Sequence, residues 1–286
     1  MFETIIGNKQ IKEMLEKSIR NGLTSHSYLF VGIQGIGKKA LAIEFSKKIL
    51  TPNQEQENLE NHPDFLLIEP DGNSIKIEQI RTLQKKIQEK PILSNQKVYV
   101  IDDADSMTQE AQNCLLKTLE EPPEFAKIIL IGSSESAFLP TIKSRCMILL
   151  FNPIEDNEIK QYMKENYGMN SITPNQLAMF QGSIGKAILV KDRQQEYENV
   201  ENMIGNLGSK DLIEILKLSE GLYKSKEEIY EILEYINILL LNYSKTNHLY
   251  TNCIKIVENV KKRLKQNANY DMCIDELVVN MWEEVN

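Results

Sequence analysis

The segment Gly32-Ile-Gln-Gly-Ile-Gly-Lys38 has the spacing of a phosphate-binding loop, with a lysine directly after its last glycine. In such a loop, backbone N–H groups surround phosphate oxygens and the lysine ammonium reaches the outer phosphates. An isolated match can also be an ordinary glycine turn. The strand and helix around it must show which of the two interpretations is right. We take Gly32, Gly35, Gly37 and Lys38 as candidate residues for binding ATP or ADP.

The residue after this lysine departs from the pattern, which has a serine or threonine there to bind Mg²⁺ through its hydroxyl. Lys39 supplies no oxygen ligand, and its ammonium would repel a divalent cation. We keep Lys39 among the residues expected to contact a nucleotide. The sequence therefore disfavours Mg²⁺ and Mg²⁺-dependent hydrolysis at this loop, and we assign no residue as a metal ligand.

Acidic residues follow the apolar run Val98-Tyr-Val-Ile101, where a strand is expected to end. Asp102 lies where sites of this type place a carboxylate that holds a metal through water. Asp103 follows it, where active ATPases of this type usually carry a glutamate that acts on the attacking water. Asp103 is one methylene shorter, so it is a weaker catalytic candidate. The alternative interpretation of these acids is a solvated strand end.

The elements around these residues alternate between strands and helices. A buried strand at 26–31 precedes the glycine loop, and a helical pattern from Ala40 to Ile49 follows it. Further apolar runs predict strands at 65–69, 98–101, 127–131 and 147–151, with helices at 77–87 and 111–120 between them. This alternation predicts an α/β domain with a parallel sheet covered on both faces.

The pattern changes after Asn152-Pro153, where residues 154–190 indicate short helices and no strand. From about residue 200 the chain is helical again, with an apolar stripe from Ile229 to Leu240. We expect three domains: an α/β nucleotide-binding domain over 1–152, a helical lid over 153–199 and a helical C-terminal domain over 200–286.

Composition excludes several classes of protein. The chain has 286 residues and a net charge of −8, which argues against a surface wrapped in nucleic acid. No apolar run approaches the ~20 residues of a membrane span, so we expect a cytoplasmic protein with no membrane partner. The four cysteines are scattered without a CxxC pair, which predicts neither a disulfide framework nor a zinc site.

Several long motifs occur in one order along residues 2 to about 190. They resemble the AAA+ core of clamp-loader subunits, and most closely the bacterial delta-prime subunits of the DNA polymerase III holoenzyme. The motifs are His26–Phe30, Asn61–Phe65, Ile68–Gly72, Asp102–Pro123, Leu139–Cys146 and Gly182–Ala187. The helical C-terminal third agrees with that family only in type.

The resemblance implies an AAA+ P-loop domain with a parallel sheet, a small helical lid and an all-α C-terminal collar through which subunits associate. It implies a five-membered ring that opens the sliding clamp and places it on primed DNA. The implied partners are motor subunits and delta, with the clamp met indirectly and primer-template DNA contacted through the complex.

The resemblance also assigns roles to residues outside the loop. Arg145, in Ser144-Arg-Cys146, corresponds to an arginine finger that acts in trans on the γ-phosphate of a neighbouring subunit. Ser133 and Ser134 fall where a polar sensor would face a γ-phosphate, and Lys186 replaces a lid arginine. The family's cysteine zinc module is expected to be absent, because residues 51–60 contain no cysteine.

The leading hypothesis is therefore a non-motor subunit of the polymerase holoenzyme, a weak ATPase or none, that offers Arg145 in trans. The alternative is an active AAA+ motor, either a clamp-loader motor subunit or a branch-migration helicase. A third reading is a scaffold that binds no nucleotide. The loop from Gly32 to Lys38 permits ATP or ADP, so the sequence leaves this choice open.

Overall fold

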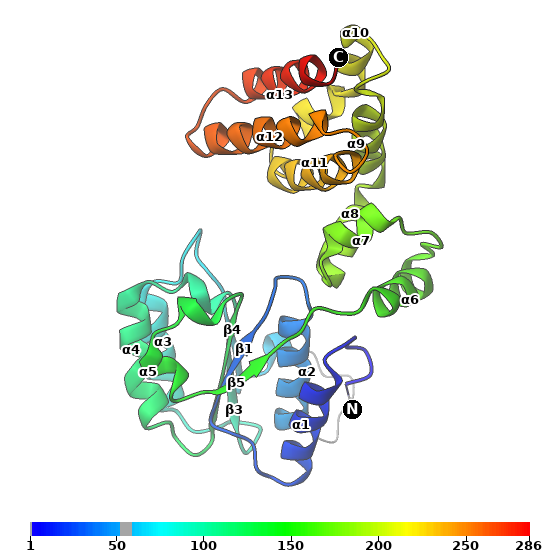
Figure 1. The fold of residues 1–286 in the computed structure, drawn as a ribbon. Coiled ribbons are helices and arrows are strands. Elements are labelled where there is room, and N and C mark those ends of the chain that lie inside the picture. Colours follow the sequence, from blue (N-terminus) through cyan, green and yellow to red (C-terminus); the bar gives the residue numbers. More distant parts are fainter. Residues whose placement is uncertain (1, 52–58) are drawn as a thin grey trace. The chain divides into compact units, whose positions relative to one another are not determined.

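The computed structural model describes residues 2–51 and 59–286 (Figure 1). Most of the cysteine-free segment at 51–60 therefore lies outside the described residues. The chain divides into two compact units, one made of 1–162 with 182–185 and one of 163–181 with 186–286. The expected division into three domains stays a prediction.

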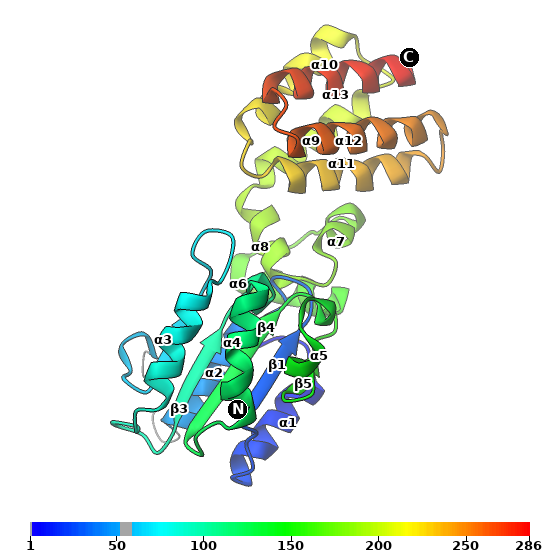
Figure 2. The ribbon, with the colours of Figure 1, turned by 90° about the vertical axis from the view of Figure 1, so that its left-hand side faces the viewer.

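A parallel sheet with the strand order β2-β3-β4-β1-β5 forms the centre of the first unit. Figure 2 shows β3, β4, β1 and β5 side by side in this order. The strands are β1 (Ser27–Val31), β2 (Phe65–Ile68), β3 (Lys97–Ile101), β4 (Ala126–Gly132) and β5 (Met147–Leu150). Each of the five predicted strands is thus confirmed to within two residues at either end.

Helices cover both faces of this sheet, so its central strands are mostly apolar and are buried along their whole length. Every residue of β1, β3 and β4 is buried. One face carries α1 (Lys9–Arg20) and α2 (Lys38–Leu50), and the other carries α3 (Ile77–Ile87), α4 (Gln109–Glu120) and α5 (Pro140–Lys143) (Figure 1). The fold is therefore the α/β fold, with a parallel sheet covered on both faces, that the sequence predicts.

The rest of the chain is helical, as the pattern after Pro153 predicts. Its longest helices, α11 to α13, bury one apolar stripe each, and the predicted stripe from Ile229 to Leu240 lies in this core. In the described part of the chain, no helix is both long and apolar enough to span a bilayer. The helices are α6 (Asp156–Tyr167), α7 (Pro174–Phe180), α8 (Ile184–Asp192), α9 (Gln194–Asn206), α10 (Leu212–Leu218), α11 (Ile229–Tyr243), α12 (Leu249–Lys265) and α13 (Tyr270–Val285).

The glycine loop between β1 and α2 is held in place by a second segment of the same unit, residues 182–185. The buried Ser183 hydroxyl donates to the carbonyl oxygen of Gln34 over 2.9 Å, and the Gly185 N–H donates to the carbonyl of Gly35 over 2.9 Å. A Cβ on Gly185 would lie 2.8 Å from the Cα of Gly35. The two backbones therefore approach closely only because both residues are glycine.

The Asn61–Phe65 motif has a structural role that explains its acid. Asp64 is buried, and its carboxylate accepts hydrogen bonds from the backbone N–H groups of Ile92, Leu93 and Ser94 at 2.7–2.8 Å. Burial alone would raise the pKa of Asp64, but the three N–H donors outweigh it and lower the pKa below its ordinary value of 3.8. Asp64 thus fixes the loop that leads into β3.

We expect Gly185→Ala to lower the free energy of unfolding by about 1–3 kcal/mol, because the added methyl overpacks the contact with Gly35. Urea titration of the purified chain would show this as a lower midpoint. Gly221→Ala is the matched control, since a Cβ there would lie 3.9 Å from the side-chain nitrogen of Asn199, an ordinary contact distance. Equal midpoints for both variants would contradict the close approach.

We expect Asp64→Asn to cost about 2 kcal/mol of stability at neutral pH, because the amide cannot accept three N–H donors as a carboxylate does. A lowered folded-state pKa gives stability that is complete above the unfolded-state pKa and is lost as pH falls through the folded-state value. Unfolding measured from neutral to acid pH should therefore show the two curves converging below the pKa of 3.8 that an ordinary aspartate has.

The control for this experiment is Asp71→Asn, which changes an exposed carboxylate in a turn of the same unit. It should leave stability unchanged at neutral pH. A loss as large as that of Asp64→Asn, or a difference between Asp64→Asn and the unsubstituted chain that persists in acid, would refute the assigned role.

Candidate functional site

The candidate site lies where the carboxyl ends of β1, β3 and β4 meet. Because these strands are neighbours in the sheet, the glycine loop, the acids after Ile101 and the serines after Gly132 reach the same edge. A cavity of about 460 Å³ opens there. Its lining consists of Gln34, Lys38, Pro70, Gly72, Asn73, Asp103, Asp105, Ser106 and Ser133.

The glycine loop has the backbone geometry that an anion cradle needs. Gly35 and Gly37 adopt positive φ angles of 74° and 99°, which favour glycine. A Cβ on Gly32 would lie 2.8 Å from the Cβ of Phe151 and 2.9 Å from its backbone oxygen, so only glycine fits there. Helix α2 begins at Lys38, directly after the loop, and a helix N-terminus favours a phosphate. These residues fit a nucleotide phosphate.

Lys38 is folded onto its own loop. Its Nζ donates to the carbonyl oxygens of Gly32 at 2.5 Å and Ile33 at 2.8 Å, and the side chain is 7% exposed. Burial lowers the pKa of Lys38, against the opposing charges of the acids that follow β3. The ammonium is thus satisfied by backbone oxygens and would have to leave them to reach a phosphate.

Lys39 bridges two carboxylates. Its Nζ lies 2.5 Å from Oε1 of Glu69 and 2.9 Å from Oδ2 of Asp102. Partial burial would lower the pKa of Lys39, but the hydrogen bonds and charges of these two partners raise it. The position that holds a metal-binding hydroxyl in the phosphate-loop pattern therefore carries an ammonium salt-bridged to Asp102. This arrangement does not fit Mg²⁺.

The remaining acids of the site are engaged in different ways. Asp103 is exposed and has a positive φ of 45°, and partial burial with the charges of Asp102 and Asp105 raises its pKa. Asp105 accepts hydrogen bonds from both the backbone N–H and the hydroxyl of Ser133. Asp103 therefore lines the cavity, and Asp105 orients the Ser133 hydroxyl.

The two serines after β4 differ in position. Ser133 lines the cavity, while the Ser134 hydroxyl accepts from the backbone N–H of Ser136 and begins a short 3-10 helix. Lys186 lies in the second unit, 3.5 Å from Glu234 and 3.2 Å from the side chain of Gln181. The sensor roles of Ser134 and Lys186 stay predictions.

Arg145 projects from the short turn between α5 and β5. Its guanidinium donates to Oε1 of Glu120 at 2.6 Å and to the carbonyl oxygen of Thr141 at 2.9 Å. Glu120 is the last residue of α4, so the helix end fixes where the arginine points. Nη1 of Arg145 also donates to the hydroxyl of Ser144 at 3.2 Å, and the residue is exposed, so another molecule can reach the guanidinium.

Sequence reasoning did not assign a role to Glu69 or Glu120. Glu69 directly follows β2 in the Ile68–Gly72 motif, and Ile68 pairs with Ile101 in the sheet. That register places Glu69 beside Asp102, so two carboxylates meet at one edge and require a cation between them. The Ile68–Gly72 motif includes Glu69 and so pointed to this residue. Its position beside Asp102 depends on the pairing of β2 with β3, which the sequence alone does not give.

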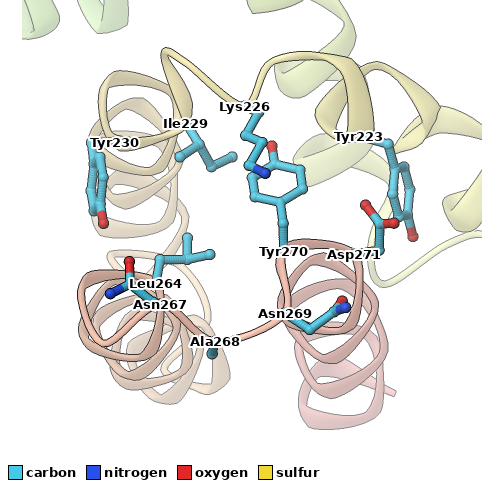
Figure 3. A pocket seen from close by; sticks show the side chains of 10 residues that line it. All are labelled: Tyr223, Lys226, Ile229, Tyr230, Leu264, Asn267, Ala268, Asn269, Tyr270 and Asp271. Atoms are coloured by element: carbon cyan, nitrogen blue, oxygen red, sulfur yellow. The ribbon is translucent and has the colours of Figure 1, made fainter.

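A second cavity, of about 550 Å³, lies in the helical unit between the start of α13 and its neighbours (Figure 3). Figure 3 shows Lys226 beside the ring of Tyr270, with Nζ 5.7 Å from the ring centroid. The Tyr270 hydroxyl donates to the carbonyl of Leu222 at 2.6 Å, and Asn269 caps α13 through the N–H of Met272. These polar groups serve the packing of the helices, and no sequence motif points to this cavity.

Comparisons with known proteins identify the family of the chain. The family model described as DNA polymerase III, delta subunit, matches residues 7–155, just over half of the chain. The chain is 36% identical over 167 residues to DNA polymerase III subunit delta′ of Bacillus subtilis, covering 54% of this chain and 51% of that protein. It is 33% identical over 239 residues to subunit tau/gamma of Haemophilus influenzae, covering 75% of this chain and 35% of that one.

The matches thus span about a third to a half of the length of these relatives. Among solved structures, a DNA polymerase III gamma subunit-related protein from Thermotoga maritima has a similar fold. The TM-score is 0.59 at 19% identity, covering 95% of this chain and 99% of that one. The chain therefore belongs to the family described as DNA polymerase III, delta subunit, and is a clamp-loader family subunit.

Proposed function

We propose that the chain acts in DNA replication as a delta-prime-type subunit of the DNA polymerase III clamp loader. Family membership and the delta′ relative from Bacillus subtilis support this role. In that role the chain associates with motor subunits and delta, and it meets the sliding clamp and primer-template DNA through the complex. It helps place the clamp on primed DNA and is a stator, a subunit that shapes the ring without hydrolysing ATP.

The observation that carries the stator role is the ion pair of Lys39 with Asp102, at 2.9 Å. ATP hydrolysis at a phosphate loop needs a metal held by the loop hydroxyl and by an acid of the Asp102 type. Here the hydroxyl is replaced and the acid is already neutralised by an ammonium. Asp103 adds no positioned base, because its side chain is exposed.

The glycine loop still supports binding of ATP or ADP. A bound nucleotide would supply phosphate oxygens as acceptors for the backbone N–H groups of residues 33–38 and for Lys38. Lys38 would exchange the carbonyls of Gly32 and Ile33 for phosphate oxygens. In a stator, such binding stabilises the subunit and need not lead to turnover.

Arg145 is the residue through which the chain would act on a neighbour. A guanidinium that is held at one edge and exposed at the other can stabilise the charge that develops on a phosphoryl group bound next door. Glu120 holds one nitrogen of the guanidinium, and the carbonyl of Thr141 holds another. Glu120 is therefore a positioning residue for the finger.

We expect Arg145→Ala to leave assembly of the loader intact and to lower ATP hydrolysis at the affected site on the order of 10³-fold. The reconstituted loader, assayed with clamp and primed DNA, gives this rate, and size-exclusion chromatography gives assembly. Arg20→Ala is the matched control, because Arg20 forms a 2.6 Å ion pair with Glu16 on the same unit. Unchanged ATP hydrolysis in Arg145→Ala would refute the role of Arg145 as an arginine finger.

Glu120→Gln should give a smaller loss than Arg145→Ala, since the amide keeps the shape but loses the charge that holds the guanidinium. We expect the double variant Arg145→Ala with Glu120→Gln to lose no more activity than Arg145→Ala alone. Additive losses would show that Glu120 acts by another route.

We expect the purified chain with Mg²⁺ and ATP to hydrolyse no faster than Lys38→Ala, because its own site has no metal ligand set. A coupled phosphate-release assay measures this directly. Turnover by the chain that Lys38→Ala abolishes would overturn the stator role and favour an autonomous AAA+ motor.

A further inference from the structure

Two carboxylates lie side by side at the carboxyl edge of the sheet. Ile68 and Ile101 are register partners in β2 and β3, so Glu69 and Asp102 are the first residues after each strand. Parallel strands bring such residues within a few ångströms of each other. Two unscreened carboxylates at this distance repel each other, so the edge needs a cation.

The cation present is the ammonium of Lys39. It lies 2.5 Å from Glu69 and 2.9 Å from Asp102, and the Asp102 side chain is only 14% exposed. The other oxygen of Asp102, Oδ1, accepts the backbone N–H of Asp103 at 3.1 Å. Both oxygens of Asp102 therefore have partners within the chain.

The ammonium also belongs to the residue at the position where the phosphate-loop pattern has a metal-binding hydroxyl. Lys39 directly follows the phosphate-loop lysine and lies in the first turn of α2, so the position of its ammonium is tied to the helix that begins at the loop. A divalent ion approaching Asp102 would have to displace a group tethered to the same helix and then remain beside its charge. An ammonium is a cation at neutral pH, so Lys39 pairs with both carboxylates without a metal, and the three groups together keep one negative charge.

We propose that Lys39 is the resident cation of this site: its ammonium joins Glu69 to Asp102 in the place of a divalent metal, and the phosphate loop takes its phosphate ligand without Mg²⁺. The second half of the proposal rests on the proposed function, whereas the first concerns the chain alone. These ion pairs form within the chain and need neither nucleotide, metal nor a partner.

A direct consequence is that one substitution at Lys39 should turn this edge of the sheet into a site that binds a divalent metal. Lys39→Thr removes the ammonium, leaves Glu69 and Asp102 without their cation and introduces the hydroxyl of the phosphate-loop pattern. Hard divalent ions prefer such oxygen ligands. Lys39→Arg keeps the charge and should keep the metal out.

The test measures metal binding by the full chain without nucleotide, using Mn²⁺ followed by electron paramagnetic resonance and Mg²⁺ followed by thermal unfolding at constant ionic strength. We expect Lys39→Thr to bind Mn²⁺ about tenfold more tightly than the unsubstituted chain and Lys39→Arg. Its Tm should fall by about 2 °C and recover on addition of Mg²⁺, whereas the Tm of the unsubstituted chain should not respond.

The matched control is Lys47→Thr, which removes a lysine of the same helix that forms a 2.7 Å ion pair with Glu44. It should gain no Mn²⁺ affinity. Asp102→Asn added to Lys39→Thr should abolish the gain, which locates the metal. No gain in Lys39→Thr, or Mn²⁺ binding by the unsubstituted chain that Asp102→Asn removes, would overturn the proposal.

The nucleotide half is tested separately by calorimetric titration with ATP, with and without Mg²⁺. We expect equal affinity in both conditions for the unsubstituted chain and Mg²⁺-enhanced affinity for Lys39→Thr. Affinity that depends on Mg²⁺ in the unsubstituted chain, or no saturable binding, would overturn this half. Neither titration involves partner subunits, so the clamp-loader role could fail while the resident cation stands, and the reverse.

Discussion

The crowding of charge at one edge of a parallel sheet is the constraint on which the site depends. Parallel strands all end on the same side, so β1 delivers the glycine loop there while β2 and β3 deliver Glu69 and Asp102. The helix after the loop delivers Lys38 and Lys39 to the same place. The resulting ion pairs place the ammonium of Lys39 between these two carboxylates.

The cationic side chains of the phosphate loop differ from Arg145 in their partners and in their exposure. At its own loop, Lys38 bonds to loop carbonyls and Lys39 to carboxylates, so both cations are satisfied before any ligand arrives. At Arg145 the cation is held by one glutamate and a backbone carbonyl and remains exposed. This arrangement supports the proposed role, in which the subunit does not hydrolyse ATP at its own loop and offers Arg145 to the site of a neighbouring subunit.

The sequence predicts what depends on local patterns and fails where distant segments meet. Apolar runs located every strand of the sheet, and the glycine spacing located the loop, because both signals lie within a few consecutive residues. The partners Glu69 and Glu120 were missed, since each meets its cation through strand order or a helix end. Ser133 and Ser134 were both candidates for the sensor. The structure places Ser133 at the cavity and Ser134 at the start of a 3-10 helix, a difference set by backbone turns that the residues do not reveal.

Crystals of the chain soaked with Mn²⁺ and a non-hydrolysable ATP analogue would decide whether the site excludes metal. The anomalous scattering of manganese locates the ion without ambiguity. We expect no peak within bonding distance of Asp102, with the Lys39 ammonium still between Asp102 and Glu69. A manganese peak coordinated by Asp102, with Lys39 displaced, would contradict both the resident cation and the stator role.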